Sequence, residues 1–284
     1  MVEWRLPVSA LTEEPETMRD TTNAPSDAQK SCFAHRLERY IDLSNSEAEF
    51  VASIEKPETR IAPGGTILSR GMHSERIFVL KSGWAAVRTE QVNGRSQILR
   101  IFLPGELIGL PEIGSMTVVH NTVAMTECVV CPMPLDRMSD IYLHEPRLAA
   151  LLTAIVSLDQ IALRERLALM ALGTARERLA NLLVDLHARL MVANPDIGRR
   201  FRLPLRQTDL AEALGLSPVY VSRLLSDFVT EGLIEIDRPY IRLLDRAQLD
   251  VLARYVNRYD ELDMTWFPPI APDEKVTAEG ATHA

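Results

Sequence analysis

The sequence is poor in cysteine and lacks the segments that would send a protein out of the cytoplasm. Three cysteines among 284 residues cannot form a disulfide framework, and the first residues contain neither the basic nor the apolar part of a secretory signal. Uninterrupted apolar runs fall short of the ~20 residues that a membrane-spanning helix needs. We therefore expect a cytoplasmic protein without a membrane partner.

Signatures of catalysis and of metal binding are missing as well. The chain has no glycine-rich phosphate loop, no nucleophile elbow and no paired carboxylates in a pocket-like setting. Its six histidines have no ligand spacing, and none of them stands out as a haem ligand. The sequence therefore predicts a protein that is not an enzyme and has no catalytic residue, no metal and no cofactor.

Two of the cysteines, Cys128 and Cys131, have a Cys-x-x-Cys spacing, but they occur in a run with the composition of a β-strand. Residues i and i+3 of a strand point to opposite faces of the sheet. We therefore expect two separate buried apolar groups rather than metal ligands or a disulfide pair.

The overall composition is that of a globular protein, with 46% hydrophobic and 25% charged residues. The net charge of −8 argues against a nonspecific polyanion binder. This total hides a basic segment, because residues 198–223 contain only two acidic residues but five arginines. Such a cluster favours contact with phosphate groups. The five are Arg199, Arg200, Arg202, Arg206 and Arg223.

An acidic, proline-containing stretch at 1–30 has no apolar period, and we expect it to be a disordered tail. A short helix is expected next, from the helical spacing of Phe33, Leu37, Tyr40 and Ile41.

Residues 58–135 then have the pattern of a β domain. Runs rich in Val, Ile, Leu and Phe alternate with glycine-marked turns, and Asn93-Gly94 between two such runs is a strong hairpin signal. Short strands at near-regular spacing predict a sandwich or barrel. The expected strands include 66–68, 77–80, 84–87, 98–102 and 128–130.

From Pro146 the apolar period becomes helical, with side chains spaced alternately by three and four residues. This stripe is typical of a coiled-coil seam and predicts dimerisation through a helix at 146–172, although Glu165 interrupts it. The alternative is a helix packed on its own β domain. The residues expected at the dimer interface are Leu148, Leu151, Ile155, Leu158, Ala162 and Leu169.

Gly173 is expected to end this helix and to mark a domain boundary. Thr174 followed by Glu177 at the third helical position predicts a capping box and therefore a new helix.

The segment 205–234 has the pattern of a helix-turn-helix. Leu210 and Leu214 share one face of a first short helix, and Gly215 ends it at a position that suits positive φ. Ser217 and Pro218 suit the N-cap and the first position of a second helix. This second helix is expected to bury Val221, Leu224, Leu225 and Phe228.

Residues 233–243 predict a β-hairpin, the wing of a winged helix, with Arg238 at its tip. Asp245 is expected to cap a last helix, and residues from Trp266 are expected to be loose. This last helix is expected to carry Leu249, Leu252, Val256 and Tyr259.

The face of the second helix opposite the buried stripe predicts contact with DNA. On this face Arg223 can donate two hydrogen bonds to guanine, and Val219 can touch a thymine methyl group. The alternatives are a solvated surface arginine at position 223 and simple packing of Val219 and Tyr220. The residues expected at DNA are Arg206, Gln207, Thr208, Ser217, Pro218, Val219, Tyr220, Ser222, Arg223 and Arg238.

Four segments together resemble the Crp/Fnr superfamily of bacterial transcription regulators: PGGTILSRG (63–71), IFVLKSGWAAV (77–87), FLPGELIGL (102–110) and DLAEALGLSPVYVSRLL (209–225). The resemblance covers roughly residues 40–250. It implies an α+β fold with an N-terminal β-roll similar to a cyclic nucleotide-binding domain (a double-stranded β-helix, cupin-like). A long dimerisation helix and a C-terminal winged helix-turn-helix follow.

The resemblance also implies a division of the chain and a set of partners. The implied parts are the β-roll at 31–145, the dimerisation helix at 146–172, the DNA-binding domain at 173–250, and the end of the last helix with a tail at 251–284. The implied partners are a second copy of the chain, double-stranded DNA and RNA polymerase.

The effector residues of this superfamily are only partly matched. Gly105 and Glu106 match the Gly-Glu pair of cyclic-AMP-binding members, but the chain reads VHNT at 119–122, where an arginine would hold the cyclic phosphate. A weak effector pocket of Gly105, Glu106, His120 and Asn121 therefore lacks a bidentate phosphate partner. Cyclic AMP is not expected to bind, and Glu106 is expected to cap a turn.

Oxygen-sensing members hold an iron–sulfur cluster with four cysteines, three of them near the N-terminus. Only Cys32 lies near the N-terminus here, so no cluster is expected. In the recognition helix only Arg223 carries over from the cyclic-AMP-binding type, and the operator sequence therefore cannot be transferred.

The leading hypothesis is a sequence-specific DNA-binding regulator that binds a palindromic operator as a homodimer. The alternative is a ligand-binding regulatory or protein-interaction module whose winged helix contacts protein. The arginine cluster favours DNA.

Overall fold

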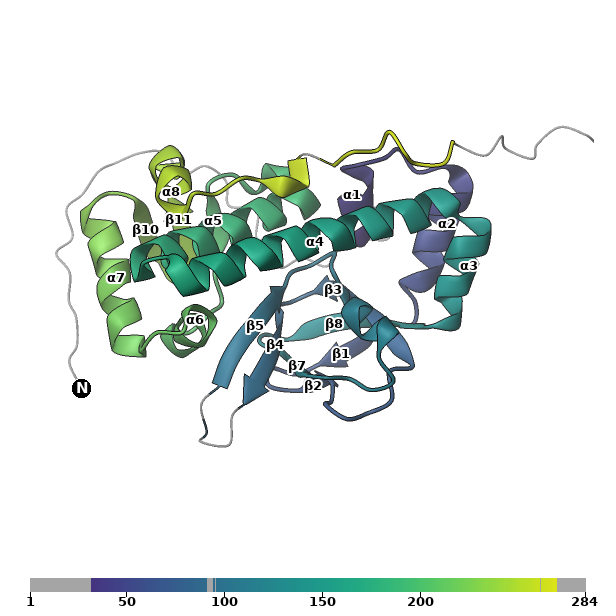
Figure 1. The fold of residues 1–284 in the computed structure, drawn as a ribbon, viewed down its shortest axis with the longest axis horizontal. Helices are drawn as coiled ribbons and strands as arrows, with labels where there is room; N and C mark the ends of the chain where they lie inside the picture. Colours follow the sequence, from purple (N-terminus) through teal and green to yellow (C-terminus); the bar gives the residue numbers. More distant parts are fainter. Residues whose placement is uncertain (1–31, 91–93, 95, 261, 270–284) are drawn as a thin grey trace, which may run out of the picture. The chain divides into compact units, whose positions relative to one another are not determined.

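Alternating short strands and tight turns produce two four-stranded antiparallel sheets in the first half of the chain (Figure 1). The computed structural model describes residues 32–90, 94, 96–260 and 262–269. One sheet has the order β1 (Thr59–Ile61), β8 (Cys128–Pro134), β3 (Arg76–Ser82), β6 (Leu107–Ile108). The other has the order β2 (Thr66–Leu68), β7 (Asn121–Ala124), β4 (Ala85–Glu90), β5 (Ser96–Phe102). The expected tail at 1–30 lies outside the described residues.

The five strands expected from the sequence all lie in these sheets, and the predicted hairpin is the antiparallel pair β4 and β5. Gly94 in its turn has φ 77°, whereas Asn93 lies outside the described residues. The strands β1, β6 and β7 were missed, because three, two and four residues show little alternation; β2, also of three residues, was expected from its apolar run beside the turn glycines Gly64 and Gly65.

The two cysteines of β8 lie on opposite faces of their sheet, as predicted. Cys128 packs in the core that includes Leu80 and Ile108, whereas Cys131 belongs to a second core that includes Leu37 and Leu151. Burial raises the pKa of each thiol to about 11, so both are inert thiols at neutral pH. Among the described residues, no group of three His, Cys, Asp or Glu side chains gathers as a metal site.

Two short helices precede the roll and pack against it. Helix α1 (Cys32–Glu38) is the expected helix but ends before Tyr40 and Ile41; these two residues are buried, as are Phe33 and Leu37. Helix α2 (Asn45–Ile54) was not anticipated, although Ser44 and Glu47 form its capping box.

Three helices follow the roll. They are α3 (Asp136–His144), α4 (Pro146–Leu172) and α5 (Ala175–Ala193). Gly173 separates α4 from α5, and the predicted capping box is present, since Glu177 N donates to Thr174 Oγ1 (3.2 Å) and Thr174 N donates to Glu177 Oε2 (2.6 Å).

The apolar stripe of α4 is divided between two environments. Leu148, Leu151 and Ile155 are buried in the core that α4 shares with α1 and the roll. In the second half of the helix, Leu172 of the stripe is 88% exposed, and Leu163 and Leu167, which lie outside the stripe, are 52% and 69% exposed. The helix packs on its own β domain over the first half of its length, which was the alternative drawn from the sequence.

Helix α4 is also the one helix among the described residues whose length and composition would let it cross a membrane. The expectation that no segment is apolar enough was therefore too strict. In its most apolar window, 39% of the residues are buried inside the protein. Core helices commonly have this composition, so the helix alone is weak evidence for a membrane span.

The last part of the chain is a winged helix. It contains α6 (Gln207–Leu214), α7 (Pro218–Thr230), α8 (Arg246–Ala253) and a three-stranded sheet in the order β10 (Ile234–Asp237), β11 (Tyr240–Leu243), β9 (Arg200–Arg202). The predicted wing is the hairpin of β10 and β11, and β9 is an additional strand. The fold is therefore α+β, as predicted.

Helix α8 is shorter than expected. Asp245 caps it as predicted, but it ends at Ala253, followed by Arg254 with φ 49°. Tyr259, expected in this helix, lies instead in a short 3-10 turn (Arg258–Asp260), and its hydroxyl donates to Asp159 of α4 (3.0 Å). Phe267 packs against the core of α1 and α4, so the expectation of a loose end is wrong at this residue.

A buried carboxylate ties the roll to α1 and α5. Glu106, in the turn between β5 and β6, accepts two hydrogen bonds from Arg189 of α5, from Nε (3.0 Å) and Nη2 (2.6 Å). Arg36 of α1 and Arg100 of β5 lie 3.4 and 3.7 Å from the same carboxylate. Burial opposes ionisation, but these arginines outweigh it and lower the pKa of Glu106 to about 2.

Glu106→Gln should destabilise the protein by about 3–5 kcal/mol, because it leaves Arg36 buried without a counter-charge and leaves Arg189 with Asp185 as its one carboxylate partner among the described residues. Chemical denaturation at neutral pH measures this loss. The contribution of Glu106 is present above its unfolded pKa of 4.5 and is lost as the pH falls toward about 2, so the difference between wild type and variant should shrink in acid.

The matched control is Glu127→Gln, which removes an ion pair with Arg60 whose side chains are 67% and 73% exposed. That change should cost less than about 1 kcal/mol. Equal losses for the two variants would show that the Glu106 cluster does not hold the roll to α5.

Candidate DNA-binding site

The helix-turn-helix forms as its local sequence dictates. Gly215 ends α6 with φ 66° and ψ 35°, a left-handed conformation that favours glycine. Ser217 then caps α7 by accepting a hydrogen bond from Tyr220 N (3.3 Å), and Pro218 takes the first helical position. The predicted stripe of α7 is fully internal. Its members Val221, Leu224, Leu225 and Phe228 are buried.

The opposite face of α7 is open to solvent. Val219 is 82% and Tyr220 43% exposed, and Ser222 and Arg223 are exposed beside them. Packing of Val219 and Tyr220 in the core, which was the alternative interpretation, is therefore wrong for this chain. Arg223 has no hydrogen bond or ion pair with any described residue, so its guanidinium is available to an outside acceptor.

The structure brings the other expected residues together around this face. Gln207 at the start of α6 reaches Ser222 of α7, with Nε2 donating to Oγ (3.3 Å). Thr208 is exposed on the same turn of α6. The start of α6 and the start of α7 thus share one surface, which also includes the exposed Ser217 and Pro218.

Arg206 stands at the N-cap of α6, with its side chain 76% exposed. Its guanidinium folds back on Asp209, donating from Nε (3.1 Å) and Nη2 (3.2 Å), while its backbone N donates to the same carboxylate (2.9 Å). These contacts hold the cation at the edge of the α6–α7 surface.

The wing contributes further cations. Arg238 is exposed in the turn between β10 and β11. Arg200 of β9 is less free, because it pairs with Asp237 (2.9 Å) and lies over the ring of Tyr240 (4.0 Å to the centroid). Of the five clustered arginines, Arg223 and Arg206 lie on the α6–α7 surface, whereas Arg200 and Arg202 belong to the wing sheet. Arg199, the fifth, precedes β9 and donates to Leu244 O (3.3 Å).

The four residues expected in the weak effector pocket do not line one cavity. Gly105 and Glu106 line a cavity of only about 20 Å³, whose wall also includes Phe33 and Arg36 of α1. His120 does not border this cavity, and Asn121 is engaged elsewhere, accepting a hydrogen bond from the backbone N of Arg70 (2.8 Å). Glu106 does cap a turn, as expected, because it accepts from Leu103 N (3.3 Å), but its main partners are arginines.

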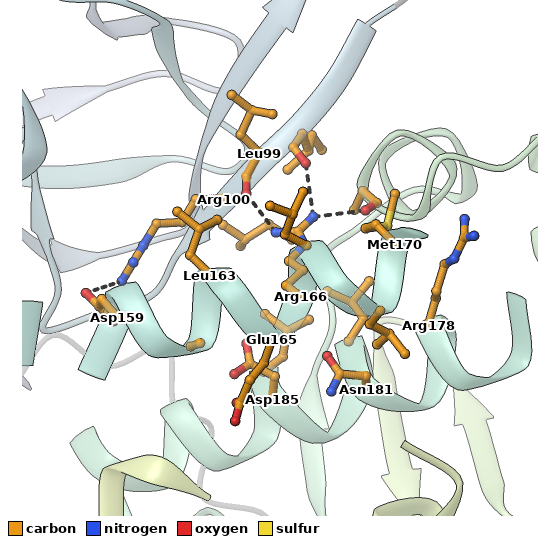
Figure 2. Close-up of a pocket in the computed structure, with 18 of the residues that line it drawn as sticks. Leu99, Arg100, Asp159, Leu163, Glu165, Arg166, Met170, Arg178, Asn181 and Asp185 are labelled. Atoms are coloured by element: carbon orange, nitrogen blue, oxygen red, sulfur yellow. Dashed lines mark hydrogen bonds and ion pairs between the residues drawn. The ribbon is translucent and has the colours of Figure 1, made fainter. Parts of the chain in front are cut away.

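A much larger groove of about 710 Å³ surrounds the second half of α4. Figure 2 shows Leu163 and Glu165 of α4 between β5 above and Asn181 and Asp185 of α5 below. Arg166 leaves α4 toward β5, where it donates to the carbonyl oxygens of Leu99 (2.7 Å) and Ile98 (3.1 Å), and it also reaches Ala213 O of α6 (2.9 Å).

Sequence reasoning missed three arginines that join the roll to the winged helix: Arg88, Arg166 and Arg189. A buried arginine has no periodicity that separates it from a surface one, because its role depends on acceptors far away in the chain. The Glu106–Arg189 contact, for example, joins residues 83 positions apart. Of these residues, the sequence analysis had singled out only Glu106, through the Gly105-Glu106 pair that matches cyclic-AMP-binding members.

Comparison with known proteins agrees with this organisation. Residues 58–145 match the cyclic nucleotide-binding domain, and residues 177–252 match the Crp-like helix-turn-helix domain. The transcriptional activator protein FnrA of Stutzerimonas stutzeri is 29% identical over 226 residues, which are 79% of this chain and 91% of that protein. The fumarate and nitrate reduction regulatory protein of Vibrio cholerae is 25% identical over 243 residues, 86% of this chain and 97% of that protein.

Solved structures show the same fold. The structure of FixK2 from Bradyrhizobium japonicum has a TM-score of 0.63 and 22% identity, covering 70% of this chain and 98% of that one. A CRP-family transcriptional regulator from Thermus thermophilus has a TM-score of 0.55 and 26% identity, covering 70% of this chain and 97% of that one.

A roll of the cyclic nucleotide-binding type followed by a Crp-like helix-turn-helix defines a DNA-binding transcriptional regulator. The chain belongs to the Crp/Fnr family of these regulators, which are not enzymes and are typically dimeric. A family of transcription factors acts on DNA inside the cell.

Proposed function

We propose that this protein binds a palindromic operator as a homodimer and reads its base sequence with the exposed face of α7. The observation that carries the proposal is the exposed Arg223, which has no partner among the described residues and stands on a capped helix whose other face is fully buried. Arg223 would donate to a guanine, while Arg206, Thr208 and Arg238 would contact phosphates. The exposed residues Ser217, Pro218, Val219, Tyr220 and Ser222, with Gln207 behind them, would form the rest of the DNA surface.

Dimerisation through 146–172 stays a prediction, and the burial of its residues supports a contact over the second half of α4. Leu148, Leu151 and Ile155 are buried in their own chain, and Leu158 packs beside them. The exposed Leu163 and Leu167 instead line the groove around the second half of α4, next to the expected interface residues Ala162 and Leu169. A second α4 seated there would cover this apolar surface.

The proposed division of the chain follows from these roles. Residues 31–145 would form the roll, 146–172 the dimerisation helix and 173–250 the DNA-binding domain, with 251–284 closing the chain. The protein would act in the cytoplasm, without a membrane partner. RNA polymerase would be its further partner, which is supported by similarity to proteins named as transcriptional activators.

We further propose that neither cyclic AMP nor an iron–sulfur cluster is the cofactor. Glu106, which would meet the ribose of a cyclic nucleotide, is already occupied by Arg189 and Arg36. A cluster needs four thiolates, and the chain has three cysteines, of which Cys128 and Cys131 are buried on opposite faces of a sheet.

Arg223→Ala should weaken binding to the operator by about 1–3 kcal/mol per half-site and relax the preference at one base pair, because a bidentate contact to guanine is lost. The operator is first defined by a genome-wide binding map, and its half-sites should lie one helical turn, about 34 Å, apart. Fluorescence anisotropy on specific and scrambled duplexes measures the change. An equal loss on both duplexes would make Arg223 a phosphate contact, and no loss on either would favour the protein-interaction alternative.

Leu163→Glu combined with Leu167→Glu should convert the dimer to a folded monomer, because two charges would be placed in a closely packed helix pair. Sedimentation velocity measures the change. Val251→Glu, at an apolar residue that is 79% exposed on α8, is the matched control and should remain dimeric. A dimeric double variant would place the interface elsewhere.

Cyclic AMP should not bind at physiological concentration, since the carboxylate that would accept from its ribose is sequestered. Isothermal titration calorimetry with the full chain tests this expectation. Micromolar affinity would overturn the proposal that the roll has lost this ligand.

A further inference from the structure

One carboxylate at the edge of the proposed DNA-binding surface accepts hydrogen bonds from two arginines that come from different parts of the protein. Asp209 of α6, with its side chain 4% exposed, is held from the solvent side by Arg206, as described above. From the inner side, Arg88 of the roll strand β4 donates from Nη2 to Asp209 Oδ1 (2.7 Å). The same guanidinium donates from Nη1 to Glu212 Oε2 (2.7 Å).

The packing of β4, β5 and α6 places Arg88 next to Asp209. The register of β4 against β5 shifts between Val87 and Arg88, an irregularity of the kind that re-aims a side chain. Helix α6 packs directly against β5, and Leu210 and Leu214 of α6 share a core with Ile98 of that strand. The Arg88 side chain is only 20% exposed, and each of its terminal nitrogens donates to a carboxylate of α6, so its charge is directed to α6.

The two arginines are not equivalent. Arg206 is mostly exposed, and a contact between an exposed cation and a carboxylate is weak. It can therefore be exchanged for a phosphate contact, provided that Asp209 is not left buried and unpaired, which is strongly unfavourable. Arg88 meets this condition, because its contact with Asp209 lies on the inner side and does not need to break. Hydrogen bonds from both arginines keep the pKa of Asp209 below its ordinary value despite burial, so the carboxylate stays charged.

We propose that Arg88 is a positioning residue for DNA binding: by neutralising Asp209 from within, it releases the guanidinium of Arg206 to a DNA phosphate. The inference rests on the proposed role of Arg206 as a phosphate contact. It also gives the roll a specific influence on the DNA surface, since Arg88 belongs to β4 and Asp209 to α6. Without Arg88, Arg206 is the only side-chain cation among the described residues that is left on the carboxylate, and it stays there.

The experiment is a double-mutant cycle read through the salt dependence of DNA binding. Anisotropy titrations of the full chain on specific and scrambled duplexes, at several salt concentrations, give the slope of log K against log salt. Arg206→Gln should flatten this slope by about one unit for each subunit bound, on both duplexes. Arg88→Gln should flatten it by the same amount, and the double variant should show no further loss.

Three additional variants separate positioning from a purely structural role. Asp209→Asn in the Arg88→Gln background should restore the slope, because Arg206 then has no carboxylate to hold it. Arg88→Lys should keep the slope, since it keeps the charge next to Asp209. Glu212→Gln removes the other partner of Arg88 but not the contact with Asp209, and it should leave the slope unchanged.

The outcomes distinguish this inference from the proposed function. If Arg206→Gln leaves the slope unchanged, Arg206 is not a phosphate contact and the proposed function fails at this residue. If Arg206→Gln flattens the slope but Arg88→Gln does not, or if the two losses add, the positioning role of Arg88 is wrong.

Should Arg88→Gln fail to fold, as thermal unfolding would reveal, the comparison of Arg88→Lys with Arg88→Lys/Arg206→Gln decides. The inference then requires a wild-type slope for Arg88→Lys and a slope flattened by about one unit for each subunit bound for Arg88→Lys/Arg206→Gln.

Discussion

The buried charge of Glu106 is the constraint on which the arrangement of the roll, α1 and α5 depends. A carboxylate removed from water is tolerated only when cations and hydrogen bonds replace its hydration. Here the replacement comes from Arg189 of α5, Arg36 of α1 and Arg100 of β5, three elements that are distant in sequence. Satisfying one charge therefore fixes the positions of three segments at once.

The same constraint explains why a family motif does not imply the family ligand. The Gly105-Glu106 pair is retained, yet its carboxylate is directed to side chains of the same chain. A ligand hydroxyl would have to displace a bidentate ion pair with Arg189, which is stronger than the single hydrogen bond that a hydroxyl donates to a carboxylate. Phe33 and Arg36 of α1 line the small cavity beside Glu106. Glu106 thus has a structural role in this protein, which supports the proposal that the motif does not bind the family ligand here.

Arginine recurs wherever the roll meets the winged helix. Arg189 joins α5 to the roll, Arg166 joins α4 to the carbonyl groups of β5 and α6, and Arg88 joins β4 to α6. A planar guanidinium suits these places because it offers several donors in fixed directions to carboxylates and carbonyls together. The apolar core between β5 and α6 provides the area of contact, and the directed hydrogen bonds of the arginines fix how the two parts are aligned.

The sequence predicted the helix-turn-helix almost residue by residue, because its determinants are local. A glycine at positive φ, a serine cap, a proline at the first helical position and a stripe at helical spacing all act within one or two turns, and each is present in the structure. The predictions failed where partners are distant. The end of α8 and the packing of Tyr259 and Phe267 depend on α1 and α4, and Asp159, the partner of Tyr259, lies 100 residues before it in the chain.

Helix α4 shows most clearly what a periodic pattern leaves open. Its stripe is continuous in sequence, but Leu151 is buried by the chain's own core while Leu172 is exposed in the groove. Periodicity identifies a face that will be covered and not what covers it. One wall of that groove is β5, which Arg166 joins to Ala213 of α6. A second copy seated on α4, as proposed above, would touch this strand, and dimerisation and the placement of the recognition surface would then share one set of contacts.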